Sequence, residues 1–273
     1  LAPAAPTPAF RRLEDFVRDV ASPGPQVVED LIERGSLTGA ASKPKVGKTM
    51  LLMNLGMSVA QGKKWLGRDV TPGRVLLFQL EDSDRTLKHR FERMAPQGLP
   101  SNFFLHTEPF QLSQENYDVT VEACQGASLV LCDPIIQATT IRDWNAQQEV
   151  RDAYELWRRL ARDTDAAVIV AAHHRKMEGE FGDAMAGSIQ AQAAVDGILE
   201  LYRDKTLDKT ERKLSFVGRD WSERDAEVIR LNTETLTWEQ GGTYAEAQQM
   251  AREGKRQEKA AKVWDALPDV PPG

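Results

Sequence analysis

The sequence predicts an α/β protein with a mostly parallel sheet flanked by helices, extended by antiparallel strands toward its C-terminal end. Two observations carry this prediction. Up to Lys176, short apolar runs typical of buried strands alternate with longer helical segments, which is the pattern of parallel strands joined by crossover helices. After Asp196, short strands follow one another with polar connections and no helices between them, which predicts hairpins that extend the sheet.

The composition is that of an ordinary folded protein. The chain has 273 residues, of which 41% are hydrophobic and 28% charged, enough for a substantial core. Its net charge of −6 argues against a broad positive coat for wrapping duplex DNA, although a local basic channel remains compatible with it. No stretch has the length of a membrane span, no signal peptide is visible, and Cys124 and Cys132 show no metal-ligand spacing. We therefore expect a cytoplasmic protein without a membrane partner.

The first functional motif is Gly47-Lys48-Thr49, which stands between a predicted strand and a predicted helix at Met50–Leu55. This is the context of a phosphate-binding P-loop, or Walker A motif, in which backbone N–H groups and a helix N-terminus surround the phosphates. Lys48 would reach the terminal phosphates and the Thr49 hydroxyl would bind Mg²⁺. The residues expected to contact the nucleotide are Ser42, Lys43, Pro44, Lys45, Val46, Gly47, Lys48, Thr49 and Met50.

One position departs from the G-x-x-x-x-G-K-[ST] pattern, because Ser42 replaces the first glycine. A serine fits there if the backbone does not need a positive φ angle. The competing interpretation of the whole motif is a flexible, lysine-rich surface turn.

Asp133 follows the apolar run Ser128–Cys132, which is the Walker B arrangement. A carboxylate at this strand end could hold Mg²⁺. The alternative is an aspartate that merely begins a turn before Pro134.

Glu81 ends the predicted strand Arg74–Leu80. We expect this strand to lie beside the P-loop strand, so that the carboxylate could reach the water that attacks the terminal phosphate. The alternative is that Glu81 or Asp82 caps the following helix, and Asp82 suits that role better. Glu81 is therefore the candidate catalytic residue.

The pair His173-His174 ends the strand that follows Asp133 in the chain. Neighbouring residues of a strand point to opposite sides, so one of the two could face the nucleotide, and His174 is the candidate sensor of the γ-phosphate. Solvated or helix-capping histidines and a metal site are the alternatives. The loops 135–145 and 177–187 would emerge on the same side of the sheet. There Arg142, Arg175 and Lys176 could contact nucleic-acid phosphates or simply be solvated.

Arg219 follows the predicted strand Leu214–Val217. It could act as an arginine finger on a neighbouring subunit's nucleotide, or it could pair with Asp220 or Glu223 on its own surface.

The ordered series of motifs resembles one family. It runs Lys45–Thr49, Leu80–Asp82, Leu131–Pro134, His173–Lys176, and Ala186–Ser188 with Val195-Asp196. This series is similar to the RecA-like ATPases of RepA-type hexameric helicases, and to AAA-like ATPase domains encoded near plasmid and phage replication genes. The resemblance implies a RecA-like core, ATP with Mg²⁺ at a subunit interface, and a hexameric ring that moves on single-stranded DNA.

Carried over by position, the resemblance implies that Lys48 and Thr49 bind phosphate and Mg²⁺. It implies that Glu81 is the catalytic glutamate, Asp133 the Walker B residue and His174 the sensor. The family's arginine finger has no certain match, so Arg219 is a provisional candidate.

We thus expect three segments and weigh three functions. Residues 1–25 form a lead-in with a short helix at Phe10–Val20, 26–240 a RecA-like ATPase domain, and 241–273 a helical tail that begins a further unit and could contact a replication protein. The leading hypothesis is a DNA helicase or DNA-dependent ATPase of plasmid or phage replication. The alternatives are a RecA- or RadA-like recombination or repair ATPase, and an ATP-switched regulator or loader that acts through a protein partner.

Overall fold

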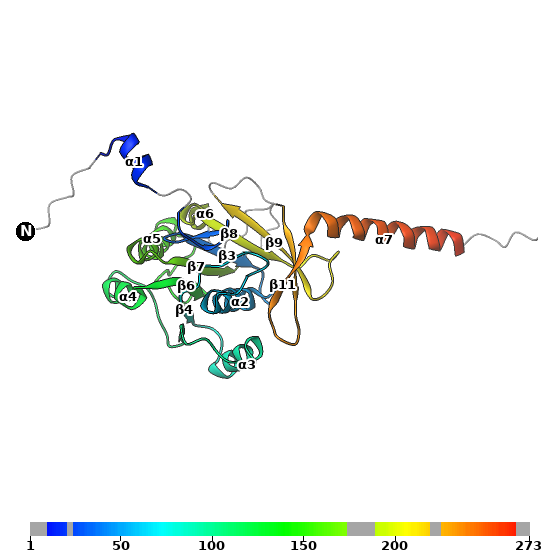
Figure 1. Cartoon of the computed structure of the whole chain (residues 1–273), viewed down its shortest axis with the longest axis horizontal. Coiled ribbons are helices and arrows are strands. Elements are labelled where there is room, and N and C mark those ends of the chain that lie inside the picture. The colour runs from blue at the N-terminus through cyan, green and yellow to red at the C-terminus, as the bar shows by residue number, and fades with distance from the viewer. Residues whose placement is uncertain (1–9, 21–23, 174–188, 219–224, 266–273) are drawn as a thin grey trace, which may run out of the picture.

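A nine-stranded sheet forms the centre of the molecule (Figure 1). The computed structural model describes residues 10–20, 24–173, 189–218 and 225–265. The strands lie in the order β11-β10-β9-β8-β3-β7-β6-β4-β5, and the six from β8 to β5 run parallel. Their bounds are β3 Leu37–Ser42, β4 Arg74–Gln79, β5 Phe103–His106, β6 Ala127–Asp133, β7 Ala167–His173, β8 Gly197–Tyr202, β9 Glu211–Gly218, β10 Glu227–Leu231 and β11 Trp238–Thr243. Strands β9 to β11 add by antiparallel pairing, which confirms the predicted α/β fold with a hairpin extension.

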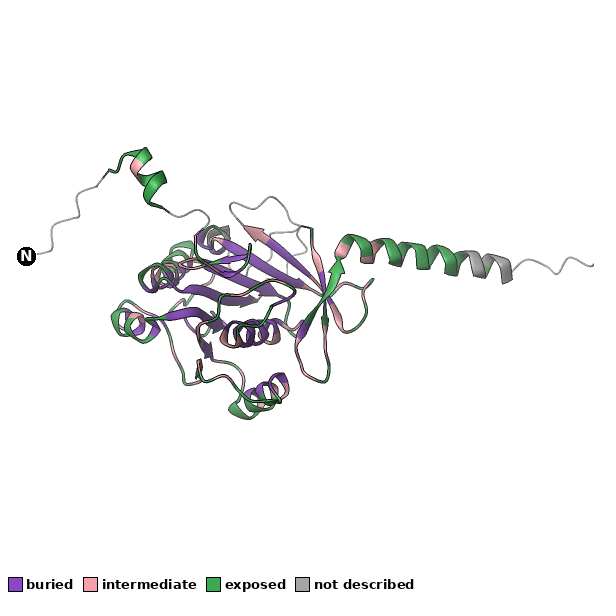
Figure 2. Cartoon of the chain, viewed as in Figure 1, coloured by how far each residue is buried: buried purple, intermediate pink, exposed green. Residues whose placement is uncertain are grey.

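Helices cover both faces of the sheet (Figure 1). On one face lie α2 (Lys48–Gln61), α3 (Asp84–Met94) and the separate hairpin of β1 (Gln26–Val28) and β2 (Ile32–Glu33). On the other lie α4 (Tyr117–Cys124), α5 (Gln147–Thr164) and α6 (Ile189–Ala194). Each face has its own apolar cluster, and the strands between them are largely buried (Figure 2).

Helix α5 shows why these segments are helical. Its apolar side chains recur every three or four residues and are fully buried at Val150, Tyr154, Trp157 and Leu160. Its other side carries charge, so one stripe packs on the sheet and the rest faces water.

Two helices extend beyond this packed body (Figures 1 and 2). Helix α1 (Leu13–Asp19) buries none of its residues. Helix α7 (Tyr244–Asp265) contacts β10 and β11 and then projects away from the sheet. None of the helices in the described part of the chain combines the length and the apolar character that a membrane crossing requires.

The last strand differs from the prediction. We expected a strand over Leu236–Glu239 that ends before Gly241-Gly242, but β11 runs from Trp238 to Thr243 and includes both glycines. A Cβ atom at Gly241 would lie 2.9 Å from the carbonyl oxygen of Val228 on β10, and Gly242 has a φ of +99°. The glycines therefore permit a close, irregular pairing of two strands instead of ending one.

Candidate nucleotide-binding site

The P-loop connects β3 to α2. Ser42 is the last residue of β3, where it is buried and pairs with His173 of β7 and Leu201 of β8. It is not among the residues with positive φ, so a serine meets no backbone penalty there, as the sequence interpretation required. The left-handed conformation occurs instead at Lys45, with φ +62°, and at Gly47, with φ +120°.

Gly47 is the N-cap of α2 and supplies no side chain to cap the helix. The first amide groups of a helix have no carbonyl partner within it, and they favour an anion. A Cβ atom on Gly47 would lie 2.7 Å from Cζ2 of Trp238, so only glycine fits between the loop and β11. The start of α2 is thus left without a side-chain cap, while the other side of the loop packs against the protein.

Two residues of the antiparallel strands hold this other side, and the sequence analysis missed both. Arg212 of β9 is buried and donates from Nε to the carbonyl oxygen of Val46 at 2.9 Å. Its guanidinium carbon lies 5.9 Å from the centre of the Trp238 ring, and the Trp238 backbone N–H donates to Asn54 Oδ1 of α2. The available signal was that Arg212 shares its side of the strand with the apolar residues Leu214 and Phe216, because alternate residues of a strand face the same way.

Lys48 and Asp133 bring opposite charges together inside the protein. Lys48 is 5% exposed and donates from Nζ to the carbonyl oxygen of Ala172 at 2.7 Å. Burial lowers the pKa of Lys48, and the nearby carboxylates of Asp133 and Glu81 oppose that shift. Asp133 is 2% exposed, and burial raises its pKa although a hydrogen bond with Thr49 and the charge of Lys48 act in the other direction. Both groups are thus held in a site that solvates their charges poorly.

Gln79 connects this pair to Glu81. Its Nε2 lies 3.3 Å from Asp133 Oδ2, and its Oε1 accepts the backbone N–H groups of Glu81 and Asp82 at 3.0 and 3.1 Å. Glu81 itself is exposed. One amide side chain therefore fixes the backbone that carries the candidate catalytic carboxylate.

The position of Glu81 corrects two expectations. Strand β4, which leads to Glu81, does not lie beside the P-loop strand β3, because β7 and β6 lie between them. The Glu81 carboxylate nevertheless acts electrostatically on Lys48 and Asp133. Asp82 is not the cap of α3. Ser83 is, and it accepts from the N–H of Thr86, while Asp82 pairs with Arg90. A hydroxyl directly before the first helical turn reaches that N–H with less strain than a carboxylate one residue earlier.

The remaining predicted residues are placed only in part. Strand β7 lies between β3 and β6 and ends at His173, next to both the P-loop strand and the Walker B strand. His174, Arg175, Lys176 and Arg219 lie outside the described residues. Arg142 is exposed in the connection between β6 and α5, where its backbone N–H donates to Glu149 Oε2.

The residues that the structure does bring together suit a magnesium nucleotide. Thr49 and Asp133 are hydrogen-bonded to each other and supply the oxygen donors that Mg²⁺ prefers. Lys48 lies next to them, and the uncapped start of α2 faces the same end of the sheet. The carboxyl end of a parallel sheet is where such folds bind ligands.

Comparisons with known proteins agree with this geometry. The chain is similar to a solved structure described as an ATPase domain, with 15% identity, 77% of this chain and 86% of that one covered, and a TM-score of 0.61. It is also similar to a DnaB-like replicative helicase described with its primase interactions (14% identity, 84% of this chain, TM-score 0.64), and it spans 66% of that helicase chain. A third similar structure is the RadB recombinase (20% identity, 77% and 92% covered, TM-score 0.55). At these identities the likeness shows a shared fold, the RecA-like P-loop fold.

Sequence comparisons identify the family. A search of curated protein sequences found no match. A family model described as "AAA domain" matches residues 5–179, more than half of the chain, including the P-loop, Glu81 and Asp133. The chain therefore belongs to the AAA domain family and has the fold of a RecA-like ATPase domain.

Proposed function

We propose that this chain is the ATP-hydrolysing motor of a DNA helicase or DNA-dependent ATPase in plasmid- or phage-type replication. The observation that carries the proposal is the meeting of Lys48, Thr49 and Asp133 at the carboxyl end of the sheet, within electrostatic reach of Glu81. The RecA-like fold and the resemblance of the ordered motifs to RepA-type helicases support the choice of a motor. The RadB likeness supports the same ATPase core.

In this proposal residues 42–50 bind the nucleotide. The amide groups at the start of α2 surround the phosphates, and Lys48 exchanges the Ala172 carbonyl oxygen for the terminal phosphate oxygens. Thr49 and Asp133 hold Mg²⁺, which when bound neutralises charge on the phosphates. The negative phosphates suit Lys48, and the positive Mg²⁺ suits Asp133. Burial denies both side chains the water that would otherwise solvate their charges.

Glu81 orients the attacking water and accepts its proton, and Gln79 positions Glu81 through the backbone. We propose His174 as the sensor of the γ-phosphate and Arg219 as the arginine finger. Arg142, Arg175 and Lys176 are proposed to contact the phosphates of single-stranded DNA.

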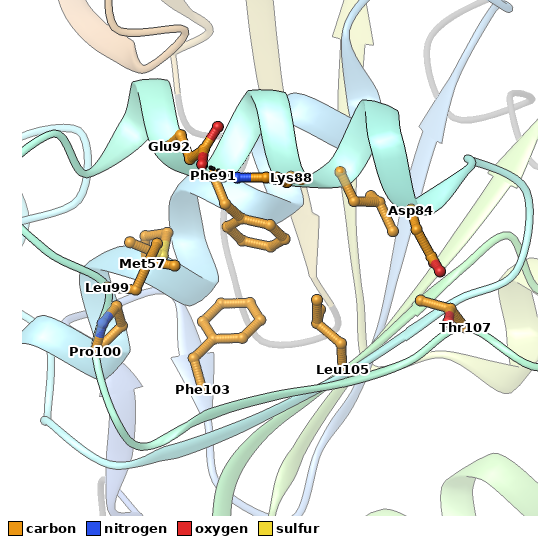
Figure 3. Close-up of a pocket in the computed structure, with 11 residues that line it drawn as sticks. Met57, Asp84, Lys88, Phe91, Glu92, Leu99, Pro100, Phe103, Leu105 and Thr107 are labelled. Atoms are coloured by element: carbon orange, nitrogen blue, oxygen red, sulfur yellow. Dashed lines mark hydrogen bonds and ion pairs between the residues drawn. The ribbon is translucent and has the colours of Figure 1, made fainter.

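We further propose that the motor is a homo-oligomer, such as a hexameric ring. Two apolar surfaces support self-association. Helix α1 exposes Leu13, Phe16 and Val17. A groove of about 400 Å³ between α3 and β5, shown in Figure 3, is lined by apolar side chains that include Phe91, Phe103, Leu105, Leu99 and Met57. We assign the groove to α1 of a second copy, because both surfaces belong to this chain and β5 is the edge of the sheet.

The function is tested by steady-state ATP hydrolysis with and without single-stranded DNA. We expect turnover in the wild type, stimulation by the DNA, and loss of turnover in Lys48→Ala. Glu122→Gln, which changes an exposed carboxylate of α4, is the matched control. Normal basal turnover without any stimulation would refute the motor.

The assembly is tested by the mass of the protein in ATP. We expect an oligomer for the wild type and smaller species for Phe16→Asp or Phe103→Asp. A monomeric wild type, or an unchanged mass in both variants, would refute self-association through these surfaces.

A further inference from the structure

Helix α7 is fixed to the domain by its first two turns and is exposed beyond them. The Tyr244 hydroxyl donates to Asp204, and Lys213 Nζ lies 4.6 Å from the centre of the Tyr244 ring. Gln248 Nε2 donates to Thr206 Oγ1 at 2.7 Å. From position 252 to 259 every residue is exposed, as Figure 2 shows. The helix therefore has a set direction relative to the domain, while most of its surface faces solvent.

The charges of this exposed part are segregated. At 3.6 residues per turn, all its cations fall within an arc of about 120°. They are Arg252, Lys255, Arg256, Lys259 and Lys262. Glu253 and Glu258 fall outside this arc. No ion pair found among the described residues includes any of the five cations, so the described part of the domain supplies no carboxylate partner for them. We call these five residues the cationic face of α7.

We infer that the cationic face of α7 is a second nucleic-acid-binding surface, which contacts backbone phosphates and acts independently of the ATPase site. Lys262 lies ten positions after Arg252, which is about 15 Å along a helix. A DNA duplex carries one negative charge per about 1.7 Å of its axis, so this length spans several phosphates. The chain as a whole has a net charge of −6, so attraction must come from a local surface such as this one.

The rest of the helix favours nucleic acid over a membrane surface. A helix that lies on a membrane needs a wide apolar side opposite its cations. Here the side opposite the cations carries Gln257 and Met250, which is the one large exposed apolar side chain in the described part of the helix, and Glu253 and Glu258 flank the cationic face. A charged helix whose described side chains form no wide apolar side suits a partner that is bound through charge.

The test is the anisotropy of fluorescent single-stranded and duplex oligonucleotides titrated with the whole chain, in EDTA and without ATP, over a series of salt concentrations. Replacing the five cations by Gln keeps helix propensity nearly constant, which circular dichroism verifies. We expect this variant to bind at least about tenfold more weakly at low salt, with a shallower slope of log K against log salt. The control Glu253→Gln/Glu258→Gln should bind as tightly as the wild type or more tightly.

Three outcomes overturn the inference. The first is that the wild type binds no oligonucleotide at low salt, and the second is that the five-cation variant binds with the same affinity and salt slope as the wild type. The third is that the five-cation variant loses binding to polyglutamate or anionic vesicles but keeps its binding to oligonucleotides. The result is independent of the proposed motor. Glu81→Gln should bind oligonucleotides as the wild type does, and the five-cation variant should keep its DNA-free ATPase rate.

Discussion

Arg212 Nε lies 2.9 Å from the carbonyl oxygen of Val46, so a strand of the antiparallel extension supports the phosphate-binding loop from behind. The same guanidinium donates from Nη1 to the carbonyl oxygens of Lys209 and Glu211. Burial lowers the pKa of Arg212, and the charge of Arg203 adds to this shift. The extension is thus part of the nucleotide site and does more than lengthen the sheet.

The first prediction concerns this support. Arg212→Met leaves the Val46 carbonyl without its charged donor, and we expect a loss of about 1.5–3 kcal/mol in the free energy of unfolding together with weaker ATP binding. The control is Arg230→Met, which removes an exposed partner of Glu211 and should change stability by no more than about 1 kcal/mol. Urea unfolding and nucleotide titration measure both, and equal effects of the two variants would contradict the account.

The second prediction compares two glycines with nearly the same backbone. Gly47 and Gly98 have φ angles of +120° and +127°, so alanine strains both. Only at Gly47 would the new Cβ meet a neighbour, 2.7 Å away on Trp238, whereas nothing lies within 4 Å at Gly98. We expect Gly47→Ala to lower the Tm more than Gly98→Ala does and to abolish ATP binding. Equal Tm shifts with retained binding would show that the loop does not pack on Trp238 as described.

The third prediction follows from the raised pKa of Asp133. A carboxyl whose folded pKa lies above its unfolded value of 3.8 stabilises the protein below that pH, and this stability is lost as the pH rises through the folded pKa. Asp133→Asn should therefore raise the Tm of the nucleotide-free protein at pH 7.5, and the gain should shrink toward pH 4. The same variant should lose the Tm increase that Mg²⁺ and ATP give the wild type. A gain that grows on acidification would contradict the burial of this charge.

The fourth prediction separates positioning from binding. Gln79→Met removes the acceptor that holds the backbone N–H groups of Glu81 and Asp82. Since a small misplacement of a catalytic group can cost roughly 10²-fold in rate, we expect a large fall in kcat with little change in KM. Gln79→Glu keeps an acceptor oxygen but replaces the donor to Asp133 by a second buried carboxylate, so it should lower the Tm at pH 7.5 more than Gln79→Met does. A rise in KM with unchanged kcat would assign Gln79 to binding instead.

Most of the sheet could be predicted because its signals are local. The apolar run that ends at Asp133 and the Gly47-Lys48-Thr49 motif each fix a strand end without knowledge of the rest of the chain. Strand order is a different matter, because nothing in the sequence states that β7 lies between β3 and β6, and the expected neighbour of the P-loop strand was wrong.

Contacts between distant segments were equally invisible. Arg212 and Val46 are 166 positions apart, and only the folded sheet brings them together. The local pattern predicts that Gly241 and Gly242 end a strand, because it carries no sign of the close approach of β10 on which their role depends.

The rate of ATP hydrolysis by the Glu81→Gln variant tests the central claim most directly. The substitution keeps the size of the side chain and removes the carboxylate that orients and deprotonates the attacking water. We predict that this variant binds ATP with wild-type affinity, while its turnover falls by about 10²-fold or more, with and without single-stranded DNA. Turnover at the wild-type rate, with Glu122→Gln as the reference, would contradict the account that Glu81 is the catalytic residue of this ATPase.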